Sequence, residues 1–343
     1  MADRRRDLLV VGGGPVGLYT AIRARLAGLD VAVIEQREGV LDKACGEGLM
    51  PEAVRLLDEV GVRPEGMPIR GFRYTDGRRA AEHRFRGQPG RGVRRTVLHE
   101  ALAHRAHELA VPVLRVRAQA LQQTGDGVEA AGITARYVVG ADGLHSRVAR
   151  EVGLTRAASR GPKRYGLRQH FAVEPWSDLV EVHWGSAVEA YVTPVAHDTV
   201  GVAMLGPRGA DFDAAVAAIP DLRERLRGAE PVSSLRGAGP FGQRTKARVT
   251  GHVLLVGDSS GYVDALTGEG LRLGFAQAAA AVDAVTADDP QAYERDWREI
   301  NRNFRRITRS LVLLAASPAR PVIVPLAARK PKLFSAVVDR LVR

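Results

Sequence analysis

The sequence predicts an α/β protein with a Rossmann-like dinucleotide-binding domain, an inserted and mainly antiparallel β-sheet domain, and C-terminal helices. Three observations predict this fold. A short apolar run leads into a glycine-rich turn near the N-terminus, middle segments alternate apolar and polar residues, and the last segment has amphipathic helical spacing. At 343 residues, the chain can form one large domain or two interleaved domains.

The first strand–turn–helix unit lies within residues 8–35. Leu8–Val11 predicts a buried strand, and residues 12–17 then match the pattern G-x-G-x-x-G. Apolar residues at helical spacing follow until Gly28, and Val31–Ile34 predicts a second strand. The unit therefore has the order of a Rossmann βαβ motif.

Each residue type in this unit has a physical role in holding a dinucleotide. Gly12 permits the tight turn, Gly14 lets the backbone approach a pyrophosphate, and Gly17 allows the helix to pack closely on the strand. Pro15 suits the first helical turn, whose free amides face the phosphates. Glu35 is expected to accept hydrogen bonds from a ribose and to repel a 2′-phosphate.

A second match to the glycine pattern, at residues 237–242, lacks this context. No buried strand precedes it, and the residues after it are too polar and β-branched for the required helix. We expect a loop there, and therefore a single nucleotide-binding unit.

Two later segments combine a strand with a glycine–aspartate turn. Asp142 and Gly143 follow a strand predicted over Tyr137–Val139. Gly257 and Asp258 follow the run VLLV and precede a long alanine-rich helix. Either dipeptide alone is a common turn former, so their order along the chain carries the information.

With the R-x-x-L pattern that begins at Arg95, these motifs make residues 6–290 resemble one flavoprotein superfamily. It comprises the group A flavoprotein monooxygenases, of the p-hydroxybenzoate hydroxylase type, and the geranylgeranyl reductases. The resemblance implies FAD as cofactor and NAD(P)H as co-substrate. It divides the chain into a discontinuous FAD-binding domain (1–70, 93–155 and 246–290), a substrate-binding sheet domain (71–92 and 156–245) and a C-terminal helical region (291–343).

The resemblance also implies roles for individual residues. Arg95 would lie near the cofactor phosphates, Asp142 near both FAD and the pyridine nucleotide, and Asp258 on the ribityl chain. The backbone of Gly268–Leu271 would lie under the isoalloxazine, where amides at a helix start stabilise negative charge. The predicted cofactor-binding residues are Gly12, Gly14, Pro15, Gly17, Glu35, Gln36, Arg37, Arg95, Asp142, Gly143, Gly257, Asp258, Gly268, Gly270 and Leu271.

The segment Gly257–Gly261 also fits the G-x-S-x-G pattern of a hydrolase nucleophile elbow, with Ser259 as the nucleophile. An α/β-hydrolase needs a histidine after that serine, and the nine histidines of this chain end at His252. We therefore expect Asp258, and not Ser259, to be the functional residue of the segment.

Two further residues are candidates for the substrate pocket. Cys45 lies in the segment CGEGL, and a similar segment lies beside the active site in geranylgeranyl reductases. A lone cysteine is also often a small buried hydrophobe, so both readings stay open. Tyr191 lies in an alternating strand, EAYVTPV, and either faces the pocket or is half buried in the sheet.

Two reactions fit the resemblance, and we expect the first. In the first, O2 supplies one oxygen atom to hydroxylate an aromatic or polyketide-like, lipophilic small molecule of secondary metabolism. In the second, FAD transfers hydride to a C=C bond as in geranylgeranyl reductases, which the segment TGEG at 267–270 resembles. A third alternative is a FAD-binding protein without turnover.

Composition limits the partners. The net charge of +11 invites a nucleic-acid interpretation, but the arginines are dispersed and aromatic residues make up 5%, so we expect no nucleic-acid partner. One cysteine, Cys45, excludes an intramolecular disulfide, and we expect no metal site. The basic, amphipathic C-terminal segment either packs on the FAD domain or contacts a membrane surface. We expect a cytoplasmic protein, as a monomer or homodimer.

Overall fold

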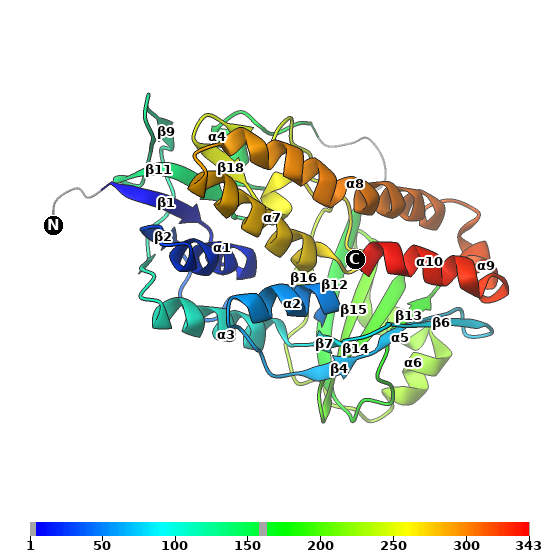
Figure 1. Cartoon of the computed structure of the whole chain (residues 1–343). Helices are drawn as coiled ribbons and strands as arrows, with labels where there is room; N and C mark the ends of the chain where they lie inside the picture. Colours follow the sequence, from blue (N-terminus) through cyan, green and yellow to red (C-terminus); the bar gives the residue numbers. More distant parts are fainter. Residues whose placement is uncertain (1–4, 158–162, 343) are drawn as a thin grey trace.

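The computed structural model describes residues 5–157 and 163–342, in which two large sheets lie side by side. Figure 1 shows β1 (Arg6–Val11), β2 (Val31–Ile34) and β11 (Ile133–Gly140) at one end of the molecule. The four strands β12–β15, within residues 164–207, lie toward the other end. The long helix α8 (Pro290–Ala315) runs along one side from the first sheet toward the second.

The first sheet has eight strands and the core order β17-β18-β11-β1-β2-β8. β1 pairs in parallel with both β2 and β11, as a Rossmann-like unit requires. The strands are β1 (Arg6–Val11), β2 (Val31–Ile34), β8 (Val113–Leu114), β9 (Gln122–Gln123), β10 (Val128–Ala130), β11 (Ile133–Gly140), β17 (Val249–Thr250) and β18 (Val253–Leu255).

The central strands β1, β2 and β18 are continuous apolar runs, and both of their faces are buried. On β1, Leu8 and Val10 face one core and Leu9 and Val11 the other, following the two-residue period of a strand. The first core is closed by α1 (Pro15–Leu26), α3 (Arg95–Glu108) and α7 (Gly270–Thr286), and the second includes residues of α4 (Arg147–Glu151).

The second sheet has seven strands in the order β16-β12-β15-β14-β13-β5-β6. All neighbours are antiparallel except β5 and β13, which run parallel. The strands are β5 (Gly71–Thr75), β6 (Ala80–Arg84), β12 (Arg164–Ala172), β13 (Val180–Trp184), β14 (Glu189–Ala196), β15 (Thr199–Pro207) and β16 (Arg236–Ala238). The chain between β5 and β13 passes through the first sheet, so the two strands are not constrained to a hairpin.

A small third sheet packs against β14 of the second sheet. It has the order β3-β7-β4, with β3 (Gly48–Leu49), β4 (Met67–Ile69) and β7 (Gly90–Gly92). The helix α2 (Pro51–Glu59) follows β3 directly. The predicted domain bounds are not tested by this arrangement and stay a prediction.

The second glycine pattern is largely a loop, with one difference from the expectation. Its first two residues, Gly237 and Ala238, end the edge strand β16, which pairs with β12. No helix follows within the described residues of this segment, so the pattern forms no second nucleotide-binding turn.

The remaining helices cover the second sheet. α5 (Phe212–Ala217) and α6 (Pro220–Arg225) pack on one face, and α9 (Ile323–Arg329) and α10 (Pro331–Val342) on the other. Two short 3-10 turns, η1 (Gly257–Ser260) and η2 (Arg320–Val322), complete the described elements. Of the helices described, none alone is long and apolar enough to cross a membrane; residues 290–315 and 320–329 together pass by length and composition but are bent by 114°.

Candidate active site

Four parallel strands of the first sheet end at the wall of one cavity of about 660 Å³. Gly12 follows β1, Glu35 follows β2, Asp142 lies just after β11, and Gly257 lies just after β18. All four residues line the cavity, whose opposite wall comes from the second sheet. Ligands of open α/β sheets bind at this carboxyl edge.

The glycine turn is sterically closed on one side and open on the other. Gly12 has φ +113°, and a Cβ there would lie 2.5 Å from the carbonyl oxygen of Ala141. A Cβ on Gly17 would lie 1.8 Å from the carbonyl oxygen of Gly12, so close helix–strand packing requires glycine. A Cβ on Gly14 would meet nothing closer than 3.8 Å, and no side chain caps α1 at this residue. The start of α1 thus presents bare backbone to the cavity.

Glu35, directly after β2, stabilises the glycine turn through hydrogen bonds. Its Oε2 accepts a hydrogen bond from the amide of Gly13 at 2.9 Å, and its Oε1 accepts from the amide of Arg37 at 2.9 Å. Burial alone would raise the pKa of Glu35, but the hydrogen bonds from Arg37 and Gly13 keep that pKa below its usual value. The carboxylate is therefore an anion at the rim of the cavity.

The start of α3 faces the same turn. The guanidinium Nη2 of Arg95 is the group nearest the open side of Gly14. Its Nε is buried and has no hydrogen-bond partner among the described residues. One helical turn later, His99 Nε2 lies 3.0 Å from the carbonyl oxygen of Gly13, and burial lowers the pKa of His99. The sequence analysis missed His99, although its spacing of four residues from Arg95 places both on one helix face.

Asp142 is bound within the protein. Its Oδ2 accepts from the amides of Arg147 and Val148 at the start of α4, at 2.6 and 3.0 Å. Its Oδ1 accepts from the hydroxyl of Ser259 at 3.0 Å, and that hydroxyl accepts from the amide of Gly143 at 2.9 Å. Ser259 thus joins the two glycine–aspartate turns, and within the described residues its hydroxyl contacts no histidine.

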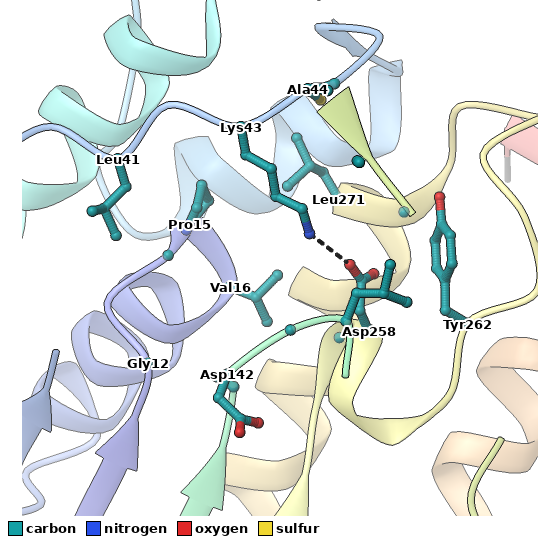
Figure 2. Close-up of a pocket in the computed structure, with 18 of the residues that line it drawn as sticks. Gly12, Pro15, Val16, Leu41, Lys43, Ala44, Asp142, Asp258, Tyr262 and Leu271 are labelled. Carbon is teal, nitrogen blue, oxygen red and sulfur yellow. Dashed lines mark ion pairs between the residues drawn. The ribbon is translucent and has the colours of Figure 1, made fainter. Parts of the chain in front are cut away.

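Asp258 and Lys43 face each other across the cavity (Figure 2). Their charged atoms lie 3.5 Å apart, with side chains 27% and 40% exposed. The side-chain Nε2 of Gln243 donates to the carbonyl oxygen of Asp258 at 2.7 Å and stabilises the turn. Lys43 was not predicted, because no motif marks it.

The segment TGEG forms the start of α7. Gly268 has φ +70°, Gly270 begins the helix, and both line the cavity together with Leu271. Glu269 does not line it: its carboxylate is buried and paired with Arg272, and burial raises the pKa of Glu269 to about 7. No side chain caps this helix start either.

Cys45 lines the cavity, and its Sγ accepts a hydrogen bond from the amide of Glu47 at 3.4 Å. Glu47 has a left-handed backbone with φ +58°, which is uncommon for a residue other than glycine. Its carboxylate accepts from the amide of Arg95 at 2.8 Å and lies 2.6 Å from His170 Nε2. The neighbouring Arg168 is fully buried, with Nε 3.7 Å from Oε1 of Glu47.

The wall from the second sheet carries no charge in the described residues. Tyr191 lines the cavity, but its hydroxyl donates to the carbonyl oxygen of Leu266 at 2.8 Å, and burial raises the pKa of Tyr191 well above 10. The charges nearest to it along β14, on Glu189 and its arginine partners, do not line the cavity. The sheet residues on the wall are Phe72, Tyr74, Val180, Tyr191, Ala203, Leu205 and Ala238.

The structure brings almost all predicted site residues together. Every residue predicted to bind the cofactor lines this cavity except Gly17, which packs under the turn, and both Cys45 and Tyr191 line it as well. Their individual roles stay predictions. No cluster of three or more potential ligands in the described residues could hold a metal ion.

Comparisons with known proteins agree with this geometry. The profile of the family described as FAD binding domain matches residues 5–287. Digeranylgeranylglycerophospholipid reductase 1 of Methanothermobacter thermautotrophicus is 29% identical, over 85% of this chain and 82% of that protein. Menaquinone reductase of Mycolicibacterium smegmatis is 28% identical, over 98% of this chain and 91% of that protein.

Solved structures show the same fold. A flavin-dependent brominase superposes with a TM-score of 0.80 at 18% identity, covering 98% of this chain and 99% of that one. A geranylgeranyl bacteriochlorophyll reductase-like protein from Thermoplasma acidophilum superposes with a TM-score of 0.73 at 20% identity, covering 87% and 84%. The predicted fold class and the resemblance to this flavoprotein superfamily are thereby confirmed.

The residues of the cavity fit FAD. The open side of Gly14, the uncapped start of α1 and the buried, unpartnered Nε of Arg95 are donors or space suited to a pyrophosphate. The uncapped start of α7 gives a second set of amides farther along the same cavity. A dinucleotide extended between the two helix starts accounts for both features.

Proposed function

The chain belongs to the FAD-binding domain family and is an FAD-dependent oxidoreductase, and from this premise we propose that it reduces a carbon–carbon double bond of an isoprenoid-like substrate. The uncharged wall of the second sheet carries this proposal. A hydrocarbon chain loses no hydrogen bonds on entering such a wall, whereas a phenol or its anion would need a polar partner.

The relatives support the same choice. Two of those with similarity over most of this chain are named as digeranylgeranylglycerophospholipid reductases, from Methanothermobacter thermautotrophicus and Methanosarcina mazei. The hydroxylation that we expected from the sequence has weaker support, because the halogenases and related enzymes are similar in fold alone.

Residues at the two ends of the cavity would hold different parts of the cofactor. Arg95 and the glycine turn would hold the cofactor phosphates, while Asp258, paired with Lys43, would orient the ribityl chain. When bound, FAD supplies two-electron redox chemistry, for which we propose NAD(P)H as the electron source. The amides at the start of α7 would stabilise negative charge on the flavin.

Saturation of a double bond also needs a proton at the second carbon. Cys45 lies on the cavity wall with a thiol that can donate one from Sγ. The tyrosines of the wall suit this task less, because burial raises the pKa of Tyr74 to about 12 and that of Tyr191 well above 10. We propose that they shape the apolar wall instead.

An anaerobic single-turnover experiment tests the reaction. The FAD-loaded protein is reduced with NADPH or dithionite and mixed, without O2, with a lipid bearing geranylgeranyl chains. The proposal expects flavin reoxidation and a product heavier by two hydrogens per double bond. Reoxidation only after O2 is admitted, with a phenolic substrate gaining one oxygen atom, would establish hydroxylation instead.

Variants of Cys45 test the proton donor. Cys45→Ala should slow product formation while FAD affinity stays unchanged, and Cys45→Ser should lie between the two because a hydroxyl can still donate. The exposed Leu235→Ala serves as a control outside the cavity. Unchanged product formation in Cys45→Ala would remove Cys45 from the mechanism.

A further inference from the structure

The C-terminal elements carry an exposed apolar surface. Nine large hydrophobic side chains are exposed in the described residues, and four of them lie between residues 313 and 333. They are Leu313 (72% exposed), Val322 (54%), Leu326 (45%) and Leu333 (55%). This concentration distinguishes the segment from the singly scattered apolar residues that any protein surface shows. We call these four side chains the C-terminal apolar surface.

The helices that carry this surface pack against the protein core with their inner faces. The residues next to it in sequence, Val312, Ala327 and Phe334, pack into one core cluster that also contains Tyr191 of the cavity wall. Arg320 donates to the carbonyl oxygens of Gly185 and Val188 at 3.0 and 2.7 Å. α10 contacts both α8 and α9, and Figure 1 shows the C-terminal part of α8 together with α9 and α10 at one end of the molecule.

Positive charge is concentrated in the same C-terminal segment. Residues 302–340 contain nine basic residues and one acidic residue, a net charge of +8 out of +11 for the chain. Asp339, the acidic one, is paired with His83. Seven of the basic side chains are exposed, and none of the seven forms an ion pair within the described residues: Arg302, Arg306, Arg309, Arg329, Lys330, Lys332 and Arg340.

We propose that this end of the molecule docks on an anionic lipid bilayer. An apolar surface with interleaved basic residues is the combination by which monotopic proteins bind such membranes. Pairing with a second copy through the same face is disfavoured, because two segments of net charge +8 would repel each other. Nucleic acid would use the charge but leave the C-terminal apolar surface in water.

This inference does not rest on the proposed reaction, although a membrane-bound position would give the cavity access to lipophilic substrates. Its test therefore uses no substrate and no reductant. The FAD-loaded full chain is floated with vesicles of phosphatidylcholine alone, or of phosphatidylcholine with phosphatidylglycerol. Binding to the anionic vesicles and little to the neutral ones is expected, since each basic residue near an anionic surface raises binding roughly fivefold.

Two double variants separate apolar insertion from adsorption by charge. Lys330→Glu with Lys332→Glu should lower the vesicle affinity by about 25-fold or more, from two charges at roughly fivefold each. Leu313→Ser with Leu333→Ser should lower it by roughly tenfold or more, because the serines bury no apolar area. The control pairs Leu235→Ser with Arg78→Glu, which are exposed elsewhere, and should bind within about twofold of the wild type.

Three outcomes would overturn the proposal. The first is wild-type protein that stays unbound with anionic vesicles at low salt. The second is vesicle binding that the leucine variant leaves unchanged, which would indicate adsorption by net charge. The third is a wild-type dimer that the leucine variant converts to a monomer in light scattering, which would make this face an interface between copies. The FAD absorption spectrum and circular dichroism verify that each variant is folded.

Discussion

The Nε2 atom of His170 lies 2.6 Å from the Oε2 atom of Glu47, deep in the boundary between the two large sheets. His170 belongs to β12 of the second sheet, whereas Oε1 of Glu47 accepts the amide of Arg95 at the start of α3. Both side chains are at most 2% exposed. One carboxylate therefore links the second sheet to the helix that faces the glycine turn.

Removing this carboxylate should destabilise the protein and weaken cofactor binding. Glu47→Ala leaves His170 and Arg168 buried without their shared partner, and breaking a buried ionic contact costs about 3 kcal/mol in the free energy of unfolding. FAD affinity should fall as well, because the amide of Arg95 loses its acceptor. Urea unfolding and FAD titration measure the two effects, with the exposed Glu65→Ala as control. If Glu47→Ala lowered the free energy of unfolding by less than about 1 kcal/mol, this structural role of Glu47 would be contradicted.

Arg95 should contribute strongly to FAD affinity, although its side chain is only half buried. A charge-assisted hydrogen bond to a phosphate is worth about 1.5–3 kcal/mol, so Arg95→Ala should raise the dissociation constant of FAD by roughly 10- to 150-fold. Arg95→Lys keeps the charge and should recover part of the loss. Fluorescence titration of the apoprotein measures the affinities, and the exposed Arg78→Ala should match the wild type. Equal FAD affinities for Arg95→Ala and wild type would indicate that the cofactor phosphates bind away from α3.

Ser259 should behave as a structural residue and not as a nucleophile. In Ser259→Ala the half-buried amide of Gly143 loses its acceptor and the carboxylate of Asp142 loses a donor, and the lost hydrogen bonds should lower the free energy of unfolding by about 1–3 kcal/mol. Wild-type protein should not react with a fluorophosphonate, because no histidine among the described residues contacts this hydroxyl to activate it. Thermal unfolding and mass spectrometry give the two readouts, with the neighbouring Ser260→Ala as a control for the labelling. Covalent labelling that disappears only in Ser259→Ala would revive the hydrolase interpretation.

Local patterns predicted the cofactor half of the site because its residues lie in short, continuous motifs. The glycine turn, Glu35 and the start of α7 are each defined by residues a few positions apart. Glu47 and His170 are 123 residues apart, so no spacing rule connects them. The direction of Tyr191 was also undecided, because seven of the eight residues of β14 are buried and the strand has no polar face to orient it.

Local sequence patterns also could not predict the parallel pairing of β5 with β13. Sequence alternation predicts strands but not their partners, and Phe72 pairs with Val180 although four strands of the first sheet lie between them in sequence. Lys43 and His99 illustrate a different limit. Both are ordinary residue types in unremarkable surroundings. They become site residues only when the loop after β2 reaches Asp258 and the helix α3 meets the glycine turn.

Glu269 predicts the pH dependence of stability. Its pKa is 4.5 in an ordinary setting and about 7 in the folded protein, where burial disfavours the anion despite Arg272. Between these values the folded state holds more protons than the unfolded state, so the free energy of unfolding falls as pH rises. The stabilising contribution is complete below pH 4.5 and lost above pH 7, a change of about 3 kcal/mol.

The isosteric variant Glu269→Gln isolates this contribution. All other titrating groups are shared with the wild type, so the difference in unfolding free energy between the two proteins reports Glu269 alone. That difference, wild type minus variant, should fall by about 3 kcal/mol from about pH 4.5 to pH 8 in urea titrations. The exposed Glu65→Gln should show almost no slope over this range. A difference that rises with pH would mean that pairing with Arg272 outweighs burial and lowers the pKa of Glu269.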